Sequence, residues 1–177
     1  QGFEQARARI EAAGAQLTAF SAPCVSDAMA LAGVVYTAEA YAVWGHRIEE
    51  DPDLMFDRVR ERFQAGQAHS AVDYIRAWHS LERLRADRLK LTAEFDAVIL
   101  PTVPRLPPKR DRIIADGDLF VAENLLALRN TRIGNLLGLC ALTLPTGVPS
   151  VGISLIAPPM QEHRLLRLGA AVEAALV

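Results

Sequence analysis

The sequence contains six serines whose hydroxyls could attack a carbonyl carbon: Ser21, Ser26, Ser70, Ser80, Ser150 and Ser154. A nucleophilic serine needs an adjacent base and backbone N–H groups that stabilise an oxyanion, usually in a turn rich in glycine and serine. None of the six lies in such a turn. A lysine acts as the base only when desolvation lowers its pKa. Because Lys90 lies on a charged helix and Lys109 in a Pro-Pro-Lys-Arg-Asp loop, we expect no catalytic residue in this chain.

Residues that could bind a metal or a cofactor are equally sparse. No histidine has metal-ligand spacing to another histidine, a cysteine or an acid; the four are His46, His69, His79 and His163. There is no glycine-rich phosphate loop, so we predict neither a metal nor a cofactor. Cys24 and Cys140 lie among apolar neighbours and are predicted to be buried free thiols. Asp116 and Asp118 flank a glycine and are predicted to form a turn.

Composition excludes several classes of partner. The chain has 177 residues and a formal net charge of −2, and its basic residues alternate with acids, so we expect no nucleic-acid partner. No apolar run reaches the length of a membrane span, and there is no signal peptide, so we expect no membrane partner and a cytoplasmic location. The chain begins at Gln1 instead of methionine, which suggests a piece of a longer protein.

The first half is predicted to be mostly helical. A helix over Phe3–Ala13 ends at a glycine, and a short strand over Gly14–Phe20 follows it. Ser26 or Asp27 is predicted to cap the next helix, Ala28–Trp44, and a shorter helix starts near Asp51 and ends by Gly66. Ser70 and Asp73 open the longest helix in the manner of a capping box. Its apolar stripe includes Ile75, Trp78, Leu81 and Leu89, and its opposite face carries Arg76, Arg83, Asp87 and Arg88.

Two apolar segments of the second half end in the same dipeptide, Pro-Thr. The strand Asp96–Leu100 stops at Pro101, and the strand Ala141–Leu144 stops at Pro145, because proline cannot donate to a sheet ladder. A third strand, Ser150–Ala157, follows so closely that we predict an antiparallel hairpin. Between the first two strands we expect a long ordered loop and two helices, and an amphipathic helix ends the chain; these segments are 101–118, 119–128, 131–139 and 161–176.

The order and spacing of these motifs resemble the C-terminal half of the amidase domain in the amidase signature family. The resemblance covers the whole chain, and the last 85 or so residues carry most of its specificity. The segments that carry it are Asp96–Pro104, Arg129-Asn130-Thr131, Asn135–Cys140, Thr143-Leu144-Pro145, Gly147, Val151-Gly152-Ile153 and Glu162. Earlier residues that match less sharply are Glu39, Arg60 to Gly66, and Asp73-Tyr74.

The resemblance implies an α/β fold that forms part of an α/β/α sandwich around a mixed β-sheet. It implies hydrolysis of a small-molecule amide by a Ser–cis-Ser–Lys triad that lies upstream of this chain. Residues 1–177 would then be the C-terminal portion of one amidase domain, inactive alone, with one wall of the acyl pocket. Candidates for that wall are Thr102, Pro104, Asn130, Thr131 and Asn135, although each could equally serve only to cap a helix or tie a turn.

Two alternatives stay open. One is a non-catalytic binding or scaffold module that keeps the fold, and the other is the amidase-type subunit of a glutamine-dependent tRNA amidotransferase. The resemblance to that subunit implies an acid near position 128, and Leu128 stands there instead, which favours a general amidase. An isolated half-sheet would expose a long edge, through which a homodimer could form.

Overall fold

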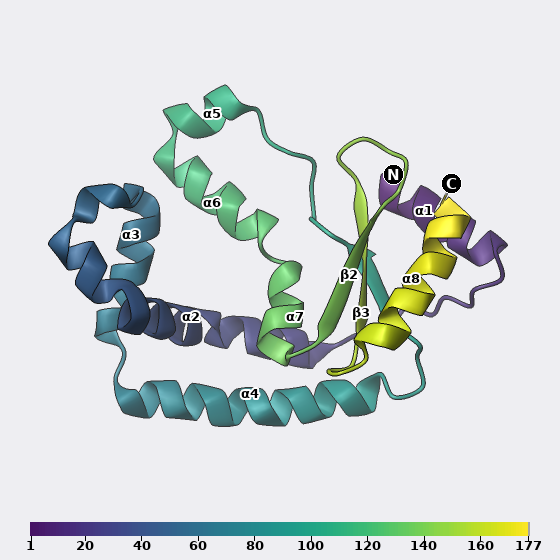
Figure 1. Cartoon of the computed structure of the whole chain (residues 1–177), viewed down its shortest axis with the longest axis horizontal. Helices are drawn as coiled ribbons and strands as arrows, with labels where there is room; N and C mark the ends of the chain where they lie inside the picture. Colours follow the sequence, from purple (N-terminus) through teal and green to yellow (C-terminus); the bar gives the residue numbers. More distant parts are fainter. Residues whose placement is uncertain (177) are drawn as a thin grey trace. The chain divides into compact units, whose positions relative to one another are not determined.

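The computed structural model describes residues 1–176 and contains helices and one small sheet (Figure 1). In the first half the helices are α1 (Gly2–Ala12), α2 (Pro23–Glu50), η1 (Pro52–Leu54), α3 (Asp57–Gln64), η2 (Ala65–Ala68) and α4 (Ala71–Leu91). The second half contains β1 (Val98–Pro101), α5 (Arg110–Ala115), α6 (Gly117–Ala127), α7 (Thr131–Leu137), β2 (Cys140–Pro145), β3 (Gly152–Ala157) and α8 (Glu162–Leu176). Both η1 and η2 are 3-10 helices.

The chain divides into two compact units. The sheet unit comprises residues 1–22 and the chain from residue 88 onward, and the helical unit comprises residues 23–87. The boundary falls within α4, between Asp87 and Arg88.

The sheet has the strand order β1-β3-β2, with β3 antiparallel to both neighbours. The α/β class and the hairpin of β2 with β3 are therefore confirmed. Every pairing among the described strands is antiparallel, so this portion of the sheet does not itself have the mixed character of the family's sheet.

One face of the sheet packs against the first and last helices and forms the core of the sheet unit. The buried residues of this core are Ala6, Ile10, Leu144, Ile153, Leu155, Ala157, Leu165 and Leu176. They alternate along β3 with Ser154 and Ile156, which point to the opposite face, as a two-residue side-chain period requires. The Arg9 guanidinium donates to the carbonyl oxygen of Leu176 at 2.6 Å, so α1 and α8 are joined near the two ends of the chain (Figure 1).

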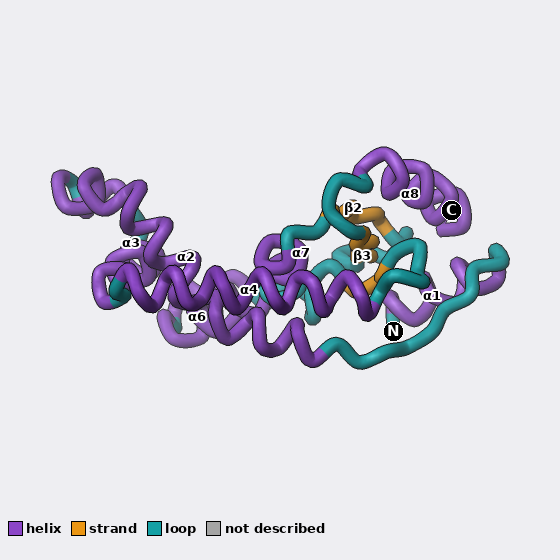
Figure 2. Tube along the Cα trace, turned by 90° about the horizontal axis from the view of Figure 1, so that it is seen from below, coloured by secondary structure: helices purple, strands orange, loops and turns teal. Residues whose placement is uncertain are grey.

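The predicted strand over Gly14–Phe20 is wrong. This segment is an extended loop without a ladder partner among the described residues, and Figure 2 shows it as a loop. Aromatic stacking holds its end in place instead. The Phe20 and Phe95 rings stack at 5.5 Å, and the Arg88 guanidinium lies 5.6 Å from the Phe20 ring. A strand forms only beside a hydrogen-bonding partner strand, and the local apolar pattern could not reveal that the described residues supply none.

The second helix is longer than its predicted span of Ala28–Trp44. It begins at Pro23 and continues to Glu50. The early start is possible because proline fits the first turn of a helix, where its missing N–H would be unpaired anyway. The Tyr74 hydroxyl donates to Glu39 Oε1 at 2.7 Å and ties α4 to α2 within the helical unit. Although α2 has 28 residues, no helix within the described part of the chain is both long and apolar enough to cross a membrane.

The buried stripe of α4 differs from the predicted one. Ala77, Leu81 and Arg88 are buried, whereas Ile75 and Leu89 are exposed. Arg88 was predicted on the solvent face, yet only 4% of its surface is exposed. Its aliphatic stem and its contact with an aromatic ring explain how a cationic residue can occupy a buried helix position.

The predicted capping box at the start of α4 is confirmed. The Ser70 hydroxyl donates to Asp73 Oδ2 at 2.7 Å, the Ser70 backbone N–H donates to the same oxygen at 3.2 Å, and the Asp73 N–H donates to Ser70 Oγ at 3.1 Å. The Ser70 hydroxyl and N–H hold the pKa of the Asp73 carboxyl below its ordinary value of 3.8. The carboxylate form therefore stabilises the helix start.

Substitution of Asp73 by alanine is expected to lower the thermal unfolding midpoint near neutral pH. Because the folded-state pKa is lowered, the carboxylate contributes stability above its unfolded-state pKa, and that contribution is lost as the pH falls through the folded value. Thermal scans from neutral to acidic pH should show the gap between wild type and Asp73→Ala narrowing below about pH 4. A gap that stays constant over this range would contradict the role of the ionised carboxylate.

Candidate functional site

The two Pro-Thr dipeptides lie at the same end of the sheet, on either side of the start of β3. Pro101 at the end of β1 is opposite Ile153, and Pro145 at the end of β2 is opposite Gly152. The two threonines then bond backbone carbonyls at the start of β3 and in the turn before it: the Thr102 N–H donates to Gly152 O at 3.0 Å, and the Thr146 hydroxyl donates to Val151 O at 2.9 Å. The shared dipeptide is thus explained by strand termination, and it brings two loops together at one sheet end.

Three hydroxyls connect β2, β3 and the residue that follows β1 close to this end. Ser154 Oγ lies 2.8 Å from Thr102 Oγ1 and 3.0 Å from Thr143 Oγ1. Ser154 is only 7% exposed, and these two partners satisfy the hydrogen-bonding capacity of its largely buried hydroxyl. The backbone of Gly152 lies so close to Thr102 that a larger residue would not fit, because a Cβ on Gly152 would lie 2.9 Å from Thr102 Oγ1. Ser154 was not among the predicted site residues, and its only signal in the sequence is a polar residue inside an apolar strand.

Ser154→Ala is expected to destabilise the sheet unit by about 1–2 kcal/mol, because it leaves a partly buried threonine hydroxyl without its partner. Urea unfolding followed by circular dichroism measures the change. The matched control is Ser21→Ala at an exposed position, which should change stability by less than about 0.5 kcal/mol. Equal urea midpoints for the two variants would show that the hydrogen bonds of Ser154 to Thr102 and Thr143 contribute nothing to stability.

A cavity of about 620 Å³ opens beside the same sheet end. Its walls come from the start of α1, the loop after β1 and the turn between β2 and β3. The lining residues are Gln1, Gly2, Phe3, Gln5, Pro101 to Leu106, and Val148 to Gly152. Ser150, in that turn, has a φ of 62°, a left-handed conformation uncommon for residues other than glycine. Such strain is often found where a turn shapes a binding site.

Two of the five predicted wall residues, Thr102 and Pro104, line this cavity. A third, Asn130, lies next to it, because its side-chain amide donates to Pro101 O at 2.6 Å. The other two are exposed on α7. Thr131 donates its hydroxyl to Leu128 O at 3.0 Å and so ties a turn, and Asn135 lines neither this cavity nor the smaller one at the end of α4.

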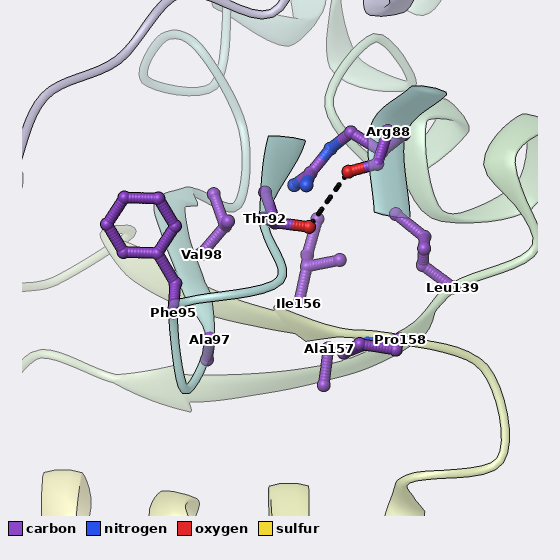
Figure 3. A pocket seen from close by; sticks show the side chains of 9 residues that line it. All are labelled: Arg88, Thr92, Phe95, Ala97, Val98, Leu139, Ile156, Ala157 and Pro158. Atoms are coloured by element: carbon purple, nitrogen blue, oxygen red, sulfur yellow. Dashed lines mark hydrogen bonds between the residues drawn. The ribbon is translucent and has the colours of Figure 1, made fainter. Parts of the chain in front are cut away.

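That second cavity, of about 10 Å³, lies where the end of α4 meets the sheet (Figure 3). Arg88, Thr92, Phe95 and Ile156 are among its lining residues, and the Thr92 hydroxyl donates to Arg88 O at 2.9 Å. Its volume leaves no room for a substrate. It is better described as the packing defect around a buried arginine than as a binding site.

That the chain lacks a nucleophile and its base stays a prediction, and the surroundings of the two lysines and of Ser154 bear on it. Lys90 and Lys109 are both exposed. The hydroxyl of Ser154 is engaged with two threonines. Asp116 accepts from the backbone N–H groups of Asp118 and Leu119 and caps the start of α6 instead of forming a turn within a loop. The long loop predicted over residues 101–118 is interrupted by α5 and the start of α6, because side-chain capping here begins a helix. Cys24 and Cys140 are free thiols, as predicted, but only Cys24 is buried and Cys140 is partly exposed.

Similarity to known proteins gives the family of this chain. The family model described as Amidase matches residues 1–166, and the chain therefore belongs to the amidase family. A 2-amino-5-chloromuconic acid deaminase of Comamonas testosteroni is 34% identical over 181 residues, which cover 97% of this chain and 38% of that protein. An amidase of Pseudomonas putida is 27% identical over 94% of this chain and 37% of its own length. The chain thus spans about two fifths of these relatives.

Solved structures show the same fold. A crystal structure of an amidase superimposes with a TM-score of 0.82 at 24% identity, and it covers 99% of this chain and 41% of that chain. The urea amidolyase of Kluyveromyces lactis superimposes with a TM-score of 0.86 at 21% identity, and it covers 99% of this chain and 11% of that chain. The α/β architecture is thus that of amidases.

Proposed function

We propose that this chain is the C-terminal part of an amidase that hydrolyses the C–N bond of a small amide. The observation that carries the proposal is the match of the family model to residues 1–166 of a chain that spans only about two fifths of its relatives. In the complete domain, a Ser–cis-Ser–Lys triad upstream of Gln1 would form an acyl-enzyme, release the amine and then transfer the acyl group to water. The exposed positions of Lys90 and Lys109 support a base that lies elsewhere.

The contribution of this chain would be one wall of the substrate pocket. Thr102 and Pro104 would face the substrate in the 620 Å³ cavity, and Asn130 would hold the loop after β1 through Pro101 O. Thr131 and Asn135 are exposed in this chain, and they would belong to the pocket wall only if another part of the complete domain packs over them. A location in the cytoplasm and the absence of a nucleic-acid partner remain part of the proposal.

A small acidic substrate is favoured over a tRNA-linked one. The relative that is 34% identical is a deaminase of 2-amino-5-chloromuconic acid, which is a small acid. A glutamyl-tRNA(Gln) amidotransferase subunit of Rhodococcus erythropolis is less similar, at 27% identity. Leu128, which occupies the position where that subunit is expected to hold an acid, ends α6 and is substantially exposed.

The proposal is tested by release of ammonia from small primary amides. The complete polypeptide of the source organism should release ammonia, and the 177-residue chain alone should release none. A coding sequence that contains only these residues, or activity of the chain alone, would contradict the proposal.

A further inference from the structure

The cavity at the sheet end has one ionised side chain among its lining residues, Arg105. Carbon-rich walls surround it, contributed by Phe3, Val103, Leu106 and Val151. The remaining polar lining groups are hydroxyls, side-chain amides and backbone. Arg105 therefore supplies the one charged side chain beside a ligand that fills this cavity, and the other lining side chains are apolar or uncharged.

The guanidinium of Arg105 is held in position from the side of α6. Its Nη1 donates to Glu123 Oε1 at 2.9 Å. The Glu123 side chain is 11% exposed, whereas the Arg105 side chain is 55% exposed, so the acid is anchored in the protein and the arginine faces outward. This bond uses one of the five N–H donors of a guanidinium, and donors remain for a ligand.

Such an arrangement suits a carboxylate better than a neutral group. The planar fork of an arginine matches the two oxygens of a carboxylate, and hydrogen bonds between ionised partners are about twice as strong as neutral ones. The bond to Glu123 reduces the side-chain freedom that would be lost when a ligand binds.

We propose that Arg105 binds a carboxylate of the substrate, so that the cavity selects small amides that also carry an acid group. The proposal deepens the function given above and rests on it for the chemical class of the ligand. Arg105 would be a specificity-determining residue, and Glu123 a positioning residue that acts through it.

Succinamate and succinamide are matched probes, because they differ in replacing a carboxylate by a neutral amide. Calorimetric titration of the complete polypeptide should show that succinamate binds at least about tenfold more tightly than succinamide. Arg105→Gln should abolish this preference, and Arg105→Lys should retain part of it, because lysine keeps the charge without the fork. Arg110→Gln removes the same charge at an exposed residue outside the cavity and should leave the preference unchanged.

The proposal is overturned if Arg105→Gln keeps the preference, if Arg110→Gln loses it equally, or if the wild-type polypeptide shows no saturable preference for succinamate. Circular dichroism of each variant identifies a loss that comes from unfolding. The titration requires no catalysis, so an Arg105-dependent preference would stand even if the complete polypeptide released no ammonia. In that case only the proposed hydrolysis would fail.

Discussion

Gly66→Ala is expected to lower the free energy of unfolding of the helical unit by about 3 kcal/mol. A Cβ at this position would lie 2.1 Å from the carbonyl oxygen of Thr37 and 2.8 Å from the Cβ of Tyr41. The first of these atoms belongs to the backbone of α2, which cannot move aside as a flexible side chain can. Urea unfolding, combined with hydrogen exchange of residues 23–87, measures the loss and localises it.

The matched control is Gly33→Ala in the middle of α2. A Cβ there would meet no atom within 4 Å, and alanine is the better helix former, so a stabilisation of about 0.8 kcal/mol is expected. If Gly66→Ala were as well tolerated as Gly33→Ala, the close packing of η2 on α2 would be wrong.

Ile153→Ala is expected to destabilise the sheet unit by about 3–4 kcal/mol. Ile153 is completely buried on the central strand, where it packs in the core formed with α1 and α8. Shortening the side chain removes apolar contacts and leaves a cavity that a three-stranded sheet closes only in part. Thermal and urea unfolding of the sheet unit give the magnitude.

Ile114→Ala provides the same chemical change at a surface position. Ile114 is 67% exposed on α5, so its replacement should change stability by less than about 0.5 kcal/mol. A comparable loss in both variants would contradict the assignment of the core to the face of the sheet that carries Ile153.

Local sequence signals predicted those elements whose partners are close in the chain. The hairpin of β2 and β3 follows from two strands separated by a short turn, and the start of α4 follows from Ser70 and Asp73. In both cases the residues that make the contacts are also the residues that carry the signal. Strand ends at Pro101 and Pro145 were predicted for the same reason.

Contacts between distant segments explain the failures. The segment Gly14–Phe20 has the composition of a strand, but a strand forms only beside a partner, and here stacking on Phe95 positions its end. Arg88 has the charge of a surface residue, yet it is buried against Phe20, a residue far away in the sequence. Periodicity alone cannot distinguish such a buried arginine from an exposed one.

The candidate site was predicted only in part. Thr102 and Pro104 were named because loops at strand ends build sites, and both line the cavity. Arg105 follows them directly but has no signal of its own, because its role depends on Glu123 eighteen residues later and on the walls supplied by α1. Substrate contact remains a prediction for all five residues, Thr102, Pro104, Asn130, Thr131 and Asn135.

The central claim is that this chain forms part of an amidase whose nucleophile lies upstream. A fluorophosphonate probe, which forms a covalent bond with an activated serine, tests it most directly when the labelled residue is mapped by mass spectrometry. We predict that the complete polypeptide is labelled at one serine preceding Gln1 and that the 177-residue chain alone is not labelled. Labelling of Ser154, or of any other serine within residues 1–177, would contradict the claim.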